Sequence, residues 1–149
     1  MINRLKALLF QGGDAEADET NQIALATAAL LIEIMVVDGH LDIKEEAAIK
    51  ALLKEQFQLE PVEISSLFEN ARQEVGNSTS LFQFTHVVNS HFSMEQKFKL
   101  TENLWQIAYA DGNLDKYEEH IVRRIADLIH IPHSEFIRAK VVAKSLKQT

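Results

Sequence analysis

The chain has 149 residues, a net charge of −7 at pH 7 and no cysteine. Its length suffices to bury one hydrophobic core, and 46 % apolar with 25 % charged residues is ordinary for a globular domain. The acidic balance argues against general nucleic-acid binding, and the lack of cysteine excludes disulfides and thiolate metal sites and favours a cytoplasmic protein.

The first twenty residues predict an N-terminal extension, followed by one helical domain over residues 21–149. The segment Met1–Phe10 predicts an amphipathic helix that packs on its own domain, with peripheral membrane association as the alternative. Gln11–Thr20 combines two glycines with acidic residues, so we expect a mobile linker. We expect no signal peptide, because the N-terminus lacks an apolar region followed by a small-residue cleavage site.

The segment Gln22–Val37 predicts the buried centre of a helical bundle, because it is apolar nearly all round. Its apolar run is interrupted and too short to span a bilayer. We expect Glu33 to be exposed on a narrow stripe with Gln22, Ala26 and Ala29. The alternative is that Glu33 is a carboxylate of a functional site.

Apolar residues at helical spacing and local end signals predict the remaining helices. Pro61 suits a first helical turn, and Ser93 with Gln96 forms a capping-box pattern for the helix leading into Trp105. The fold class is therefore an all-α, single-domain bundle of about seven to eight helices. Besides the helix after Ser93 and a helix after Asp115, the predicted segments are Ile43–Phe57, Pro61–Val75, Leu81–Phe92 and His133 to about Lys147.

Two of these helices carry predicted surface pairs at helical spacing. Glu46 and Lys50 form an outer i,i+4 pair, and Glu119 with Arg123 forms another on the helix after Asp115. The buried face of that second helix is predicted to be Tyr117, Ile121, Ile125, Leu128 and Ile129.

The segments Leu30–Leu59 and Leu104–Ile131 share the string D-G-x-L-D-x-x-E-E at an offset of 73 residues, from position 38 to position 111. This repetition indicates an internal duplication of a helix–turn–helix unit, with copies over about 23–60 and 96–132. In each turn a glycine can close the first helix, and an Asp three residues before a Glu can cap the second.

The same string resembles the second half of a calcium-binding EF-hand loop. The first ligand positions of such a loop would fall on apolar or aromatic residues, so a complete EF-hand is excluded and a half-site remains. If the duplication brings the turns together, their carboxylates would repel one another, and a divalent cation (Ca, Mg or Mn) would relieve the repulsion. The alternative is two independent cap motifs. The candidate ligands are Asp38, Asp42, Glu45, Glu46, Asp111, Asp115, Glu118 and Glu119.

Other chemistry-bearing residues have structural interpretations. His86 and His91 are five residues apart, which is the wrong spacing for a shared ligand face. Asp127 and His130 are spaced for a metal, but no third ligand lies nearby in sequence. The aromatic residues around Trp105 are expected to be core and rim rather than a cofactor pocket.

The string LWQIAYADGNLDKYEEHIVRRIADLIHIPHSEFIRAK, with ALLIEIMVVDGHLD and FQFTH before it, resembles the TerB-like tellurite-resistance family. The resemblance runs from about Ile23 to Val142 and is nearest to an uncharacterised bacterial branch, with the N-terminal domain of the DjlA co-chaperone as a relative. It departs at Val37, where the family usually has Ala. The resemblance implies an all-helical fold with a pseudo-two-fold arrangement of the copies, and acidic residues suspected of binding divalent cations at the candidate positions.

No nucleophile–base set, phosphate loop or redox motif accompanies these features, so we expect that the protein is not an enzyme. The favoured function is an interaction module with a protein partner, of a stress-response or tellurite-resistance type, that does not bind nucleic acid. The alternative function is a divalent-cation-binding protein.

Overall fold

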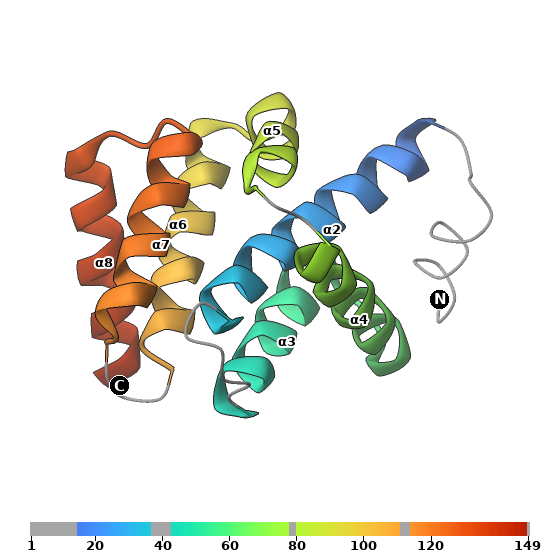
Figure 1. Cartoon of the computed structure of the whole chain (residues 1–149), viewed down its shortest axis with the longest axis horizontal. Helices are drawn as coiled ribbons and strands as arrows, with labels where there is room; N and C mark the ends of the chain where they lie inside the picture. The colour runs from blue at the N-terminus through green and yellow to red at the C-terminus, as the bar shows by residue number, and fades with distance from the viewer. Residues whose placement is uncertain (1–14, 37–42, 78–79, 111–113, 149) are drawn as a thin grey trace.

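The computed structural model of the protein describes residues 15–36, 43–77, 80–110 and 114–148. These residues form seven α-helices and no strand (Figure 1), which confirms the predicted all-α class. The predicted helix Met1–Phe10 lies outside the described residues. The helices are α2 (Ala15–Val36), α3 (Ile43–Phe57), α4 (Pro61–Asn77), α5 (Phe82–His91), α6 (Met94–Ala108), α7 (Lys116–Leu128) and α8 (His133–Gln148).

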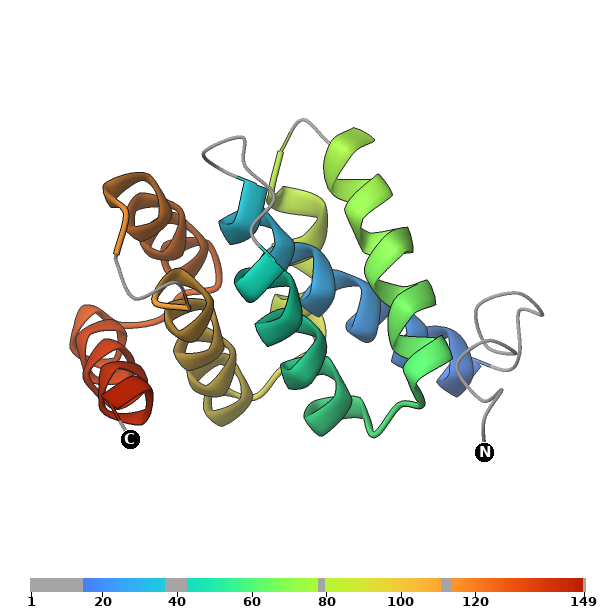
Figure 2. The same ribbon diagram turned by 90° about the horizontal axis from the view of Figure 1, so that it is seen from below.

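Helix α2 is the centre of the bundle, because α3, α4, α5, α6 and α7 all pack against it (Figures 1 and 2). Its residues from Ala24 to Met35 are almost all buried, as the sequence predicts. The expected exposed stripe is wrong, since Ala26 and Ala29 are buried and Glu33 is partly buried. The physical reason is that neighbouring helices cover α2 on several sides, and the small alanines admit close approach.

Helix α2 is also longer than the apolar run predicts. It begins at Ala15, within the expected linker Gln11–Thr20, so that interpretation is wrong for the last six residues, 15–20. Alanine and glutamate in this stretch favour helix, and acidic residues suit a helix N-terminus. The window Glu19–Val36 is long and apolar enough, by length and composition, to cross a membrane, but over half of it is buried among other helices. Its apolar composition is thereby accounted for by the protein core.

Helix α6 is the second buried element, and it contacts α2, α3, α7 and α8 (Figure 2). Trp105 is fully buried, and its Nε1–H donates to the backbone oxygen of Phe136 on α8 at 3.3 Å. The two rings lie 5.0 Å apart between centroids. Leu104 is buried as well, while Phe98 and Tyr109 are partly buried against the core. The interpretation of these residues as core and rim is therefore confirmed.

The duplicated segments have matching burial. The helix pair α2–α3 corresponds to the pair α6–α7 at the offset of 73 residues. In α3 and α7, Ile49 and Val122 are both fully buried, and their neighbours Ala48 and Ile121 are both partly buried. The repeated sequence pattern thus corresponds to a repeated packing pattern.

The end signal predicted for α6 is confirmed, whereas the glycines predicted to close a helix in each copy lie outside the described residues. The capping box of α6 is complete: Ser93 Oγ accepts from the Gln96 N–H at 3.1 Å, and Gln96 Oε1 accepts from the Ser93 N–H at 2.7 Å. Two helices are followed by residues in the left-handed region, Gln58 (φ 54°) and His130 (φ 65°). After α7, the Ile131 N–H donates to Ala126 O at 2.9 Å, which closes the helix end.

The predicted face of α7 is partly wrong. Tyr117 is 57 % exposed, and the buried positions include Glu118 and Val122, one residue further along than expected. Ile125 and Ile129 are buried as predicted. Ile121 and Leu128 of the predicted face are partly buried against the core, so the buried face is turned by less than the roughly 100° that separates consecutive residues. The packing of α7 on α6 and α2, which the local sequence does not contain, fixes this orientation.

Candidate functional site

Of the eight predicted cation ligands, Asp38, Asp42 and Asp111 lie outside the described residues. Asp115 is the N-cap of α7, and its Oδ1 accepts a hydrogen bond from the Tyr117 N–H at 2.6 Å. The predicted role of this Asp as a helix cap is therefore confirmed, with the bond going to the second residue of the helix. This bond occupies one carboxylate oxygen with a structural task.

Glu45 and Glu118 occupy equivalent places in the two copies. Each lies in the first turn of its helix, and each is only 3 % exposed. Each of the two glutamates makes at least one polar or electrostatic interaction in the structure. The positive end of a helix dipole stabilises a carboxylate in the first turn, so this position suits a buried acid. The repeated burial indicates that both glutamates contribute to the way each helix begins.

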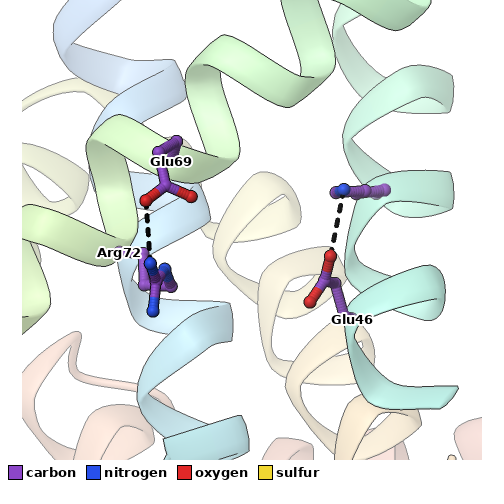
Figure 3. A network of polar contacts seen from close by, with 4 residues as sticks. Glu46, Glu69 and Arg72 are labelled. Carbon is purple, nitrogen blue, oxygen red and sulfur yellow. Dashed lines mark hydrogen bonds and ion pairs between the residues drawn. The ribbon is translucent and has the colours of Figure 1, made fainter. Parts of the chain in front are cut away.

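Glu46 and Glu119 are also equivalent, and both form ion pairs. Glu46 Oε2 lies 3.0 Å from Lys50 Nζ, so the predicted pair on α3 is confirmed (Figure 3). Glu119 Oε2 lies 3.3 Å from Lys140 Nζ on α8. The predicted pair of Glu119 with Arg123 is wrong, because Arg123 instead lies over the Phe136 ring, 5.3 Å from its centroid. Both glutamates are thus balanced by lysines.

The Glu46–Lys50 pair belongs to a polar surface shared by α3 and α4 (Figure 3). Lys50 Nζ lies 5.0 Å from the centroid of the Phe68 ring on α4. On the same helix, Arg72 Nη2 donates to Glu69 Oε1 at 2.8 Å. This hydrogen bond, helped by the positive charges of Arg72 and Lys50, holds the pKa of Glu69 below its ordinary value. The contact between Lys50 and Phe68 links α3 to α4. The two carboxylates and the two basic groups of this surface balance one another in charge.

Residues that flank the two predicted acidic turns in the sequence line one groove. Lys44 follows the first of these segments and Ala110 precedes the second. The groove has a volume of about 340 Å³ and is lined by Lys44, Ala48, Gln106, Ala110, Ala143 and Leu146. Within the described ranges, however, no three His, Asp or Glu side chains are grouped so that they could hold a metal ion.

The histidines singled out in the sequence make structural contacts. The His86 ring stacks on Phe82 at 5.6 Å between centroids. His91 Nδ1 lies 3.5 Å from Glu19 Oε1, which connects the end of α5 to the start of α2. His130 follows the end of α7 in a left-handed conformation. These placements support the structural interpretation of all three residues.

Glu33 of α2 is a half-buried carboxyl, where the sequence predicts an exposed one. Its removal from water raises the pKa of Glu33 above the ordinary value of 4.5. A neutral, protonated side chain is easier to bury than a carboxylate, so the ionised form of Glu33 opposes the packing around α2.

A second groove lies between α3 and α6, which contact each other (Figure 2). Its volume is about 300 Å³, and its lining is Leu52, Glu55, Gln56, Gln96, Lys99, Leu100 and Asn103. Asn103 is 3 % exposed, and its Oδ1 has no hydrogen-bond partner among the described residues. A buried amide oxygen left without a partner costs about 1–3 kcal/mol.

The sequence analysis missed Asn103. Its neighbours one turn away on α6 are Lys99 and Gln106 as well as Leu100 and Ile107, so the sequence pattern holds no signal that sets Asn103 apart. The groove itself depends on the apposition of α3 and α6, which the sequence does not encode locally.

The seven described helices, with α2–α3 and α6–α7 as matching pairs, define a small all-helical domain. The sequence model of the family described as tellurite resistance protein TerB matches residues 24–141. The match covers well over half of the chain, so the protein belongs to this family. No curated protein and no solved structure gives a significant match to the chain.

Proposed function

We propose that the protein is a non-enzymatic interaction module of the tellurite-resistance type that binds a protein partner through α8. The observation that supports the proposal is the outer face of this helix. Phe136, Ala139 and Ala143 point into the core, whereas Ile137 and Val141, four residues apart, are 41 % and 61 % exposed. Lys144 is exposed one turn further along. Exposed apolar residues beside basic ones suit a partner with apolar and acidic groups.

Helix α8 is well placed for this role because it lies at one side of the bundle (Figure 1) and packs mainly on α6. Ion pairs to Glu135 and Glu119 hold Arg138 and Lys140 on the helix. Lys144 is a described basic residue of α8 that takes part in neither of these ion pairs, so it is available to an acidic partner. The helix therefore presents a small apolar surface with a basic margin.

The experiment is affinity capture from a native extract with the full chain as bait, followed by identification of the bound proteins. Ile137→Asp together with Val141→Asp should lose the reproducible partner. A matched control is Val62→Asp, since Val62 is exposed on α4, away from α8. Absence of any reproducible partner, or equal capture by the two variants, would contradict the proposal.

We also propose, as a second candidate function, binding of a divalent cation by the acidic turns. The supporting observation is that Lys44 and Ala110, which flank the two turns, line the same groove. Calorimetric titration with Ca²⁺, Mg²⁺ and Mn²⁺ tests it, and we expect saturable heat that Asp38→Asn with Asp111→Asn removes. Glu69→Gln is the control, because Glu69 already pairs with Arg72. If the native protein shows no heat of binding and no thermal shift with any of the three ions, this function is refuted.

A further inference from the structure

We propose that the groove between α3 and α6 is a binding site for a small neutral carboxamide. The groove has a volume of about 300 Å³ and lies between helices from different copies of the duplicated unit. This size falls at the lower end of pockets that bind small molecules. It is distinct from the α8 surface and from the groove beside the acidic turns.

The first argument is the placement of Asn103. Its side chain lines the groove, the residue is almost completely buried, and its Oδ1 lacks a hydrogen-bond partner in the described part of the chain. A leucine of similar size would fill this position without an unsatisfied amide. Buried polar groups are nearly always paired, so the unpaired oxygen calls for a donor from outside the protein. The Oδ1 atom is itself covered, and a turn of the side-chain amide would bring it to the groove.

The second argument is the composition of the remaining wall. Leu52 and Leu100 supply apolar contact area for a hydrocarbon group. Glu55 and Lys99 carry opposite charges, so the lining has no net charge, and Lys99 Nζ lies 3.4 Å from Glu102 Oε1. A charged ligand would gain little here and would lose its hydration. These features favour an uncharged molecule with an apolar body.

The third argument concerns the polar group of the ligand. A carboxamide has both N–H donors and a carbonyl acceptor. It can therefore pair with the side-chain amide of Asn103 whichever way that amide is turned, and the terminal torsion of Asn rotates over a broad range. An alcohol or an ester offers only part of this complement. The carboxamide is thus the chemical class that fits the groove best.

The test is a titration of the isotope-labelled full chain with benzamide, followed by two-dimensional amide NMR. We expect saturable shifts at the Asn103 side-chain amide and at the backbone of Leu52 and Leu100. Methyl benzoate has a similar shape without an N–H and should bind about tenfold more weakly, because one hydrogen bond is lost. Shifts that do not saturate, or equal binding of the two compounds, would overturn the proposal.

Variants locate the site. Asn103→Leu should remove the preference for benzamide over methyl benzoate, and Leu52→Trp should block the groove while Asn103 is kept. The second variant keeps the test decisive if the first fails to fold. Thr27→Val is the matched control, because Thr27 is a buried polar residue on α2 that does not line this groove. Unchanged benzamide binding in Leu52→Trp would refute the assignment.

Discussion

Two fully buried threonines allow a direct test of how a buried hydroxyl affects stability with and without a hydrogen bond. Thr27 on α2 and Thr101 on α6 are both inaccessible to solvent. Thr101 Oγ1 donates to Lys97 O at 2.9 Å, whereas Thr27 Oγ1 has no partner among the described residues. The two sites therefore differ mainly in hydrogen bonding. Replacement of each by valine keeps the branched shape and a similar helix propensity.

The structure predicts opposite signs for the two replacements. Burial of a hydroxyl without a partner costs about 1–3 kcal/mol, so Thr27→Val should raise the free energy of unfolding by about 1 kcal/mol. At Thr101 the lost hydrogen bond is worth about 1 kcal/mol, so Thr101→Val should lower the free energy of unfolding by that amount. For a chain of this length, 1 kcal/mol corresponds to about 2–4 °C in Tm.

The assay is urea denaturation followed by circular dichroism, with thermal melts as a second readout. A constant slope of the free energy against urea concentration would show that the variants change stability and not the extent of unfolding. The reasoning is refuted if Thr27→Val destabilises the protein as much as Thr101→Val does. That result would mean that the Thr27 hydroxyl is satisfied in solution.

Three further changes test other parts of the structure. Burial raises the folded-state pKa of Glu33 above 4.5, so the stability that this group contributes is present at acid pH and lost as pH rises. Glu33→Gln should therefore raise Tm near neutral pH and have little effect on Tm well below pH 4.5. An equal change in Tm at both pH values would contradict this. Ser93→Ala removes one half of the capping box and should cost about 1 kcal/mol in urea denaturation, while no loss would show that the cap is dispensable. His130→Gly relieves a left-handed conformation (φ 65°) and should add about 0.5–1 kcal/mol in the same assay, and a loss would indicate that the imidazole makes a contact of its own.

Features that depend on near neighbours in the chain could be predicted from the sequence. The capping box of Ser93 and Gln96 and the pair of Glu46 with Lys50 each lie within one helical turn, where spacing fixes geometry. The helix class, the buried centre α2 and the core position of Trp105 follow from apolar periodicity. These predictions needed no knowledge of how the helices are arranged.

Features that depend on the arrangement of helices could not be predicted in this way. Glu119 could reach Arg123 on its own helix, but Lys140 on α8 forms the pair. The rotation of α7 that exposes Tyr117 is likewise set by its neighbours. Asn103 becomes a candidate binding residue only because α3 lies beside α6. The predicted ligands in the acidic turns stay predictions, since three of the eight lie outside the described residues.

The central position of α2 determines whether the two copies of the duplicated unit can be separated into fragments that fold. Helix α2 belongs to the first copy, yet it supplies packing surface to α5, α6 and α7 as well as to α3 and α4. A fragment that ended after α4 would leave much of that surface in water, and the complementary fragment would lack its scaffold. We therefore expect neither copy of the duplicated unit to fold without the other.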